Sequence, residues 1–266
     1  MILWDTLEAV TTIMTEVITM LNEETKRKLR ELNIGELITA IELQQQDSTT
    51  VSLSFDERMQ RLVDYLYQEK YNGKIQRLIK SAKFRFPKAD IHSIYYDGRS
   101  LKRDIITELS TCQFVRNNHS VVFQGYTGSG KTYLACSLGK EACRHQIKTK
   151  YIRLPDLLME FDEAQLIAGK EKKLLNKYAK IPLLILDEWL MADISAEELH
   201  FIFELMERRS DSTSTIFCTQ YSKKDWVKKL GQGVYAEAIV DRYAYTTTWV
   251  ETGKSNMREY CANLSN

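Results

Sequence analysis

The sequence predicts an α/β fold in which helices cover both faces of a mostly parallel, five-stranded sheet. After residue 120, short runs rich in β-branched and aromatic residues alternate with helical stretches. Such alternation favours parallel strands joined by crossover helices. A glycine-rich motif joins the first run to the helical stretch after it. The expected strands are Val121–Phe123, Tyr151–Ile152, Leu183–Leu186, Thr215–Cys218 and Thr246–Val250.

Length and composition are those of an ordinary globular protein. The chain has 266 residues, 44% hydrophobic and 27% charged, which suits one α/β domain with a small appendage. Its five cysteines include no C-x-x-C pair, so we expect buried free thiols in a reducing compartment. No apolar run approaches the ~20 residues of a membrane span, and Asp5 and Glu8 argue against a signal peptide. We therefore expect a cytoplasmic protein without a membrane partner.

A small all-helical N-terminal domain is expected before the sheet. Apolar residues recur at helical spacing from Leu7 to Leu21, and the stretch Asn33–Gly35 is typical of a helix end. The residues Ser54–Glu57 have capping-box form and begin a second helical stretch. We predict a helical domain at residues 1–68, a basic linker or helix at 69–98 and the α/β domain that contains the sheet at 99–266.

A basic segment lies between these two parts. Seven lysines and arginines occur from Lys70 to Lys88 with no acidic residue among them, although the net charge of the chain is only +1. Several are three or four residues apart, which aligns them along one side of a helix. Such a patch can contact DNA phosphates without reading bases, or it can be a merely solvated helix face. The candidate DNA-binding residues are Lys70, Lys74, Arg77, Lys80 and Lys83.

The strongest motif is the glycine-rich stretch Gly125–Thr132, which fits G-x-x-x-x-G-K-[ST]. Glycines let the backbone curl so that successive N–H groups point at phosphate oxygens, and the following helix directs its positive end at the same charge. Lys131 is expected to reach the β- and γ-phosphates of ATP, and the Thr132 hydroxyl to ligate Mg²⁺. The predicted nucleotide ligands in this stretch are Gly125, Tyr126, Thr127, Gly128, Ser129, Gly130, Lys131 and Thr132.

Two carboxylates follow the apolar strand Leu183–Leu186. The carboxyl edge of a parallel sheet is where such folds bind ligands. We predict that Asp187 holds Mg²⁺ through water and that Glu188 orients and deprotonates the attacking water. An adjacent glutamate indicates a hydrolase, whereas a kinase needs a second site for a phosphoryl acceptor.

Polar residues also end the strand at Thr215–Cys218. Thr219 or Gln220 is predicted to contact the γ-phosphate or the lytic water. The alternative, that the two residues merely begin a turn, remains open from the residues alone.

Several stretches together resemble one family. They are Gly125–Thr132, Leu183–Glu188, Thr219–Trp226 and Ala238–Tyr243, with Glu69–Ile91 and Arg99–Cys112 upstream. They look like the IstB-like transposition helper ATPases, relatives of DnaC-type helicase loaders and of the initiator branch of AAA+ proteins. The resemblance covers roughly residues 55–260 and implies an AAA+ P-loop fold.

The resemblance implies roles for residues outside the phosphate loop. Thr219 or Gln220 matches the γ-phosphate sensor, and Arg242 matches an arginine finger that acts on the ATP of a neighbouring subunit. Without the resemblance, Arg242 is interpreted as one member of a surface Asp-Arg pair on a helix. Arg258 resembles a second sensor near phosphate, although the chain ends too soon for a helical lid domain.

The resemblance also implies a function. It is that of an ATPase that oligomerises on double-stranded DNA, with ATP sites at subunit interfaces, and recruits or activates a transposase. A replicative helicase loader, whose partner is a hexameric helicase, is the alternative. From the residues alone, a P-loop enzyme that acts on a metabolite without DNA also remains open.

Overall fold

A computed structural model describes residues 21–231, 233–244 and 246–264 of the chain. The helix predicted within residues 1–20 lies outside the described part. The chain forms two compact units, residues 1–74 and 75–266, which divide inside the long helix α4 (Phe55–Ala82). The predicted three-part division at residues 68 and 98 stays a prediction. Within the described ranges, no helix is both long and apolar enough to cross a bilayer.

The first unit is helical. It contains α2 (Glu23–Glu31), α3 (Glu36–Gln46), the 3-10 turn η1 (Ser48–Ser52) and the first part of α4. The predicted capping box opens α4: the Glu57 N–H donates to Ser54 Oγ at 3.3 Å and the Ser54 N–H donates to Glu57 Oε2 at 2.8 Å. These reciprocal bonds satisfy backbone donors that a helix start leaves open.

The second unit is built on the predicted sheet. Its strands are β1 (Ser120–Gln124), β2 (Thr149–Arg153), β3 (Leu183–Asp187), β4 (Ser214–Thr219) and β5 (Thr247–Glu251). All four pairings are parallel, in the order β2-β3-β4-β1-β5. All five predicted strands are therefore confirmed. Because β1 lies between β4 and β5 rather than beside β2, the loop after β1 opens at a crevice in the carboxyl edge, where such sheets bind ligands.

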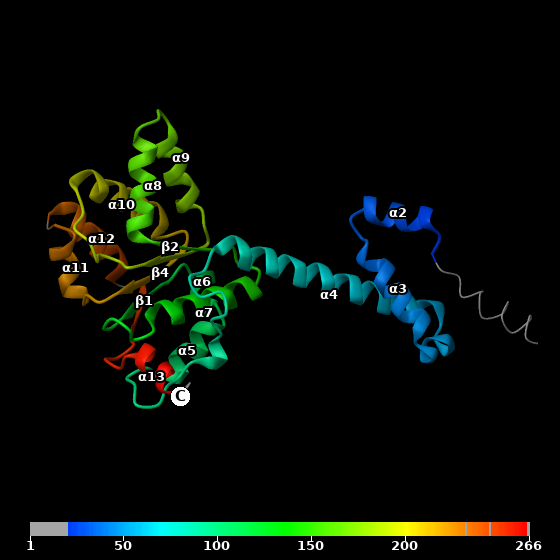
Figure 1. Ribbon diagram of the computed structural model, residues 1–266. Coiled ribbons are helices and arrows are strands. Elements are labelled where there is room, and N and C mark those ends of the chain that lie inside the picture. The colour runs from blue at the N-terminus through cyan, green and yellow to red at the C-terminus, as the bar shows by residue number, and fades with distance from the viewer. Residues whose placement is uncertain (1–20, 232, 245, 265–266) are drawn as a thin grey trace, which may run out of the picture. The chain divides into compact units, whose positions relative to one another are not determined.

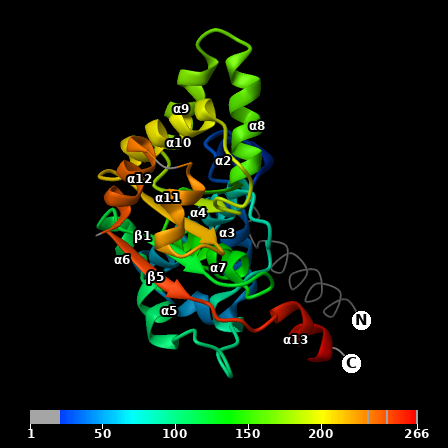
Figure 2. The same ribbon diagram turned by 90° about the vertical axis from the view of Figure 1, so that its left-hand side faces the viewer.

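Helices cover both faces of the sheet, and each face has its own core (Figures 1 and 2). One face carries α8 (Leu154–Gln165), α9 (Lys170–Ala179), α10 (Ala196–Arg209), α11 (Lys223–Lys229) and α12 (Val234–Ala244). The other carries α5 (Arg103–Ser110), α6 (Gln113–Arg116) and α7 (Lys131–Arg144). Alternate strand residues serve the two cores: Val122 packs with the first group and Val121 with the second.

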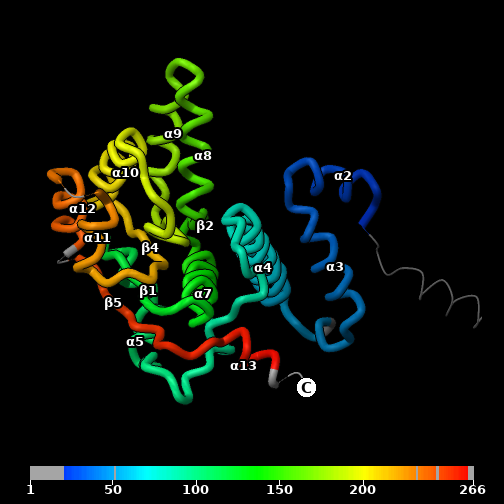
Figure 3. The backbone as a smooth tube through the Cα atoms, turned by 60° about the vertical axis from the view of Figure 1, so that its left-hand side comes forward, coloured from blue at the N-terminus to red at the C-terminus, as the bar shows by residue number. Residues whose placement is uncertain are grey.

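The segment between α4 and α5 lies beside the end of the chain (Figure 3). It contains the short 3-10 turn η2 (Ile91–Ser93), and the C-terminal helix α13 (Met257–Leu264) packs near it. The Tyr95 and Tyr260 rings meet edge-to-face at 5.1 Å between centroids. This contact joins two segments far apart in sequence at one end of the pocket described next.

Candidate functional site

The glycine-rich loop connects β1 to α7, as predicted. Its backbone has positive φ at Gly128 (84°), and a Cβ there would lie 2.3 Å from Asn256 Oδ1. Only glycine suits this position, because both the backbone conformation and the close approach of Asn256 exclude a side chain. The helix α7 begins at Lys131, so its positive end faces the loop. The loop can therefore receive an anion.

The Lys131 ammonium folds back over the loop. Its Nζ donates to the carbonyl oxygens of Gly125 and Tyr126, each at 2.8 Å. Burial lowers the pKa of Lys131 below its ordinary value, because the charged form loses solvation. A phosphate that pairs with this ammonium would recover that lost solvation, so the site favours a polyanion.

Thr132 and Asp187 meet at the start of α7 and the end of β3. The Thr132 hydroxyl donates to Asp187 Oδ2 at 2.9 Å, and the Tyr151 hydroxyl donates to the same oxygen at 2.7 Å. Burial, together with Asp187, raises the pKa of Tyr151, so the phenol stays a donor. A hydroxyl and a carboxylate with fixed orientation are hard oxygen ligands that suit Mg²⁺. The donor set fits the predicted metal, whose binding here stays a proposal.

Glu188 follows at a turn with a φ of 55°, an uncommon backbone conformation for a residue with a side chain. Two guanidinium groups hold its carboxylate: Arg85 Nη1 lies 3.1 Å from Oε1 and Arg153 Nη1 lies 3.5 Å from Oε2. Hydrogen bonding to Asp156, followed by the charge of Glu188, raises the pKa of Arg153. The predicted base is thus oriented, and its oxygens face two cations.

Sequence reasoning missed Arg85 and Arg153. Arg153 ends β2, and the register pairs it with Asp187 on β3. Once β2 and β3 are taken as neighbours, that position is predictable. Arg85 belongs to the basic segment, and nothing local in the sequence sets it apart from the other cations there.

Of the two candidate sensors, Gln220 faces the phosphate loop. Its Nε2 donates to Thr127 Oγ1 at 3.0 Å. The Thr219 hydroxyl instead donates to the Trp189 carbonyl at 3.0 Å and accepts from the Tyr221 N–H at 3.1 Å. The geometry therefore favours Gln220 over Thr219 as the residue that contacts phosphate or water.

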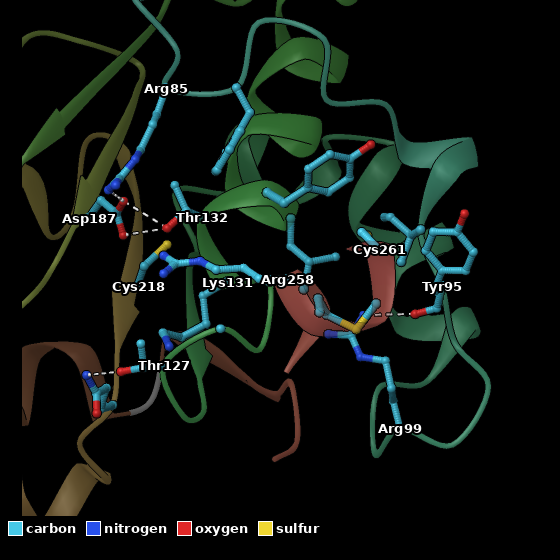
Figure 4. A pocket seen from close by; sticks show the side chains of 18 of the residues that line it. Arg85, Tyr95, Arg99, Thr127, Lys131, Thr132, Asp187, Cys218, Arg258 and Cys261 are labelled. Atoms are coloured by element: carbon cyan, nitrogen blue, oxygen red, sulfur yellow. Dashed lines mark hydrogen bonds and ion pairs between the residues drawn. The ribbon is translucent and has the colours of Figure 1, made fainter. Parts of the chain in front are cut away.

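These residues line one cavity of about 810 Å³ (Figure 4). The phosphate loop, Asp187 and Glu188 line it together with Tyr95, Met257 and Arg258, and Arg258 lies beside Lys131 (Figure 4). The volume is ample for a nucleotide. Arg258 is thus near the predicted ligand, as a second sensor needs to be.

Arg242 is not among the residues that line this cavity. It lies on α12, forms an ion pair with Glu207 of α10 and stacks over the Phe203 ring at 5.4 Å. Within its own chain Arg242 therefore does not reach the predicted ATP, so its predicted role requires a neighbouring subunit.

The predicted DNA-binding residues lie along α4 and at its end. Lys70 is paired with Glu36 at 3.0 Å, while Lys74, Arg77, Lys80 and Lys83 are exposed. Their DNA contact stays a prediction.

Comparison with known proteins identifies the family. The profile described as IstB-like ATP binding protein matches residues 27–264. This chain belongs to that family. An insertion sequence IS1162 putative ATP-binding protein from Pseudomonas fluorescens is 33% identical over 76% of this chain and 87% of its own length. A putative insertion sequence ATP-binding protein, y4uH from Sinorhizobium fredii, is 28% identical over 90% of this chain and 96% of its own length.

Solved structures show that this IstB-like protein has the AAA+ fold. The DnaC helicase loader matches with a TM-score of 0.53 and 21% identity, over 63% of this chain and 98% of that one. The replication initiator DnaA, bound to AMPPCP and single-stranded DNA, matches with a TM-score of 0.54 and 17% identity, over 67% and 56%. Family and fold together establish an ATP-binding P-loop ATPase.

Proposed function

We propose that this IstB-like ATPase assists DNA transposition: it binds Mg-ATP, oligomerises on double-stranded DNA and recruits or activates a transposase. The observation that carries the proposal is a cavity lined by phosphate-loop residues together with Asp187, Glu188 and Gln220, in a chain whose relatives are described as insertion sequence ATP-binding proteins.

The residues of the pocket divide the chemistry. The loop N–H groups and Lys131 would bind the phosphates, while Thr132 and Asp187 would hold Mg²⁺, which neutralises charge on the β- and γ-phosphates. Glu188 would accept the proton of the attacking water, which Gln220 helps to orient from its place beside Thr127. Arg242 would stabilise the transferred phosphoryl group of a neighbouring subunit.

The position of Arg242 supports oligomerisation. An arginine that is needed at the γ-phosphate but does not line its own pocket must act on another chain. ATP would then lie between two subunits, and hydrolysis would act as a timer that dismantles the assembly.

The DNA contact would be electrostatic. The exposed cations of the basic segment, from Lys74 to Lys83, can pair with phosphates on duplex DNA and carry no means of reading bases. The protein would therefore bind duplex DNA of any sequence, with strong salt dependence.

One experiment tests the proposal and its alternative. ATP hydrolysis is measured with and without random-sequence duplex DNA, and the protein is then tested for retention of an insertion-sequence transposase and of a replicative helicase. Nucleotide-dependent retention of the transposase alone supports the transposition role. Retention of the helicase alone would favour a loader, the alternative that the likeness to the DnaC fold keeps open. An ATPase indifferent to DNA and to both partners would refute both.

A further inference from the structure

The proposed general base is held by a cation outside the predicted site. Arg85 Nη1 lies 3.1 Å from Glu188 Oε1. It also lies 3.9 Å from Asp187 Oδ2 (Figure 4). Burial alone would lower the pKa of Arg85, but hydrogen bonds to Tyr151 and Glu188 and the charge of Asp187 raise it above its ordinary value. The guanidinium occupies a carboxylate lone pair that would otherwise accept a hydrogen bond from water.

The backbone around Arg85 is anchored on the helix that begins at the phosphate loop. Phe84 is buried against Gly139 of α7, where a Cβ would lie 2.5 Å from the Phe84 ring and 2.8 Å from Ile185 Cδ1. Phe86 packs on Tyr133 of the same helix, with ring centroids 6.1 Å apart. Two aromatic anchors thus flank Arg85 and direct its side chain toward Glu188.

The same segment continues directly into the cations proposed to contact DNA. The helix α4 ends at Ala82, and the chain turns at Lys83 with a φ of 56°. Lys80 and Lys83 are exposed, and the Arg85 side chain is itself 43% exposed. Arg85 is thus partly open to solvent and follows Lys83 by two residues in the chain.

We propose that Arg85 is a positioning residue that couples DNA contact to ATP hydrolysis, an inference that rests on the proposed function of Glu188 and of the basic segment. Paired with Glu188, the guanidinium withholds the carboxylate from the lytic water. DNA phosphates compete for the guanidinium, and its departure frees the carboxylate to accept the proton of water. Arg153 remains to orient the freed group.

The test compares steady-state hydrolysis by wild type, Arg85→Ala and Arg85→Lys, each with and without saturating random-sequence duplex DNA. For Arg85→Ala we expect basal kcat to rise about twofold to fivefold, the range available to a partly exposed ion pair. The KM for ATP stays unchanged and the stimulation by DNA shrinks by the same factor. Arg85→Lys gives an intermediate basal kcat, since one ammonium can still pair with one Glu188 oxygen.

The matched control is Arg116→Ala, which removes the same charge from an exposed arginine on α6 that does not line the pocket. We expect wild-type basal kcat and wild-type stimulation by DNA. Equal melting temperatures for all variants exclude an effect of partial unfolding. Adding Glu188→Gln to Arg85→Ala removes the gain in kcat, because the gain acts through that carboxylate.

Three results overturn the coupling. In the first, basal kcat and DNA stimulation of Arg85→Ala stay at wild-type values. In the second, kcat falls. In the third, KM for ATP rises about tenfold at constant kcat, which would make Arg85 a phosphate ligand. Failure of the proposed function gives a different result: single Glu188→Gln hydrolyses normally, or wild type ignores DNA. In the latter case the basal kcat of Arg85→Ala still tests the restraint on Glu188.

Discussion

Two arginines lie at opposite ends of the sheet and are held in opposite ways. At the amino ends of β3 and β4, Arg209 is fully buried and donates to the carbonyl oxygens of Tyr178 (2.7 Å), Ile181 (2.9 Å) and Ser214 (2.5 Å). At the carboxyl ends, the partly exposed Arg85 faces the carboxylates of Asp187 and Glu188. One cation is bound by neutral backbone, and the other by charged side chains beside a cavity.

The difference indicates which contacts can exchange. Burial lowers the pKa of Arg209 to about 10, a sign of the desolvation cost that its hydrogen bonds must offset. These carbonyl groups are fixed in place by α9, by the turn before β3 and by β4, so we expect this arrangement to be permanent. Carboxylates beside a cavity can turn to a metal ion or water, so the arrangement around Glu188 can change during a catalytic cycle.

Substitution of Arg242 is expected to have the largest effect on kcat. Like Arg85, this arginine pairs with an exposed carboxylate, here Glu207, so we expect the pair to be exchangeable. If it acts on a neighbouring subunit, Arg242→Ala lowers kcat by about 10³-fold or more. Lys131→Ala should be inactive through loss of ATP binding. Mixing the two inactive proteins should restore measurable hydrolysis, since some interfaces then combine an intact loop with an intact finger. No recovery at any mixing ratio would contradict a role in trans.

Glu188→Gln tests the carboxyl end of the sheet directly. We expect kcat to fall about 10²–10⁴-fold, because an amide cannot accept the proton, whereas equilibrium binding of ATP persists. The DNA-bound assembly should therefore last longer, as measured by dissociation after dilution. Normal hydrolysis would show that another group activates water.

Arg209→Leu tests the permanent arrangement at the amino end. The substitution leaves buried carbonyl groups without donors, so we expect the free energy of unfolding to fall by about 3 kcal/mol. Urea denaturation provides the measurement. The matched control is the adjacent Arg208→Leu, an exposed arginine paired with Glu204, whose loss should change stability by no more than about 0.5 kcal/mol. Equal effects of the two would mean that the carbonyl contacts of Arg209 are not the source of stability.

The exposed cations of the basic segment should give the smallest effect on hydrolysis itself. Replacing Lys74, Arg77 and Lys80 with Glu should weaken duplex binding and spare basal kcat. If each contacts one phosphate, the slope of log affinity against log salt becomes about 2.7 less steep. Fluorescence anisotropy over a salt series measures it. Unchanged affinity would assign DNA contact to another surface.

Local sequence patterns predicted the strands, the phosphate loop and the acid pair. They did not predict the contacts between residues that are far apart in the chain. The phosphate loop and the acid pair are contiguous stretches, so their residue types and spacing carry their chemistry. Glu188 meets Arg85 across 103 positions, a contact that depends on strand order and on how Phe84 docks on α7. Arg209, in the last turn of a helix, has the sequence signature of an exposed cation, and only the packed fold shows it to be buried.

Gly139 has a consequence beyond packing. A methyl group at this position, in the middle of α7, would collide with Phe84. Alanine in place of Gly139 would therefore push outward the segment that carries Arg85. A substitution that favours the helix by intrinsic propensity would then loosen the restraint on the catalytic base. Turnover in this enzyme would be tuned by the bulk of one side chain that touches neither nucleotide nor DNA.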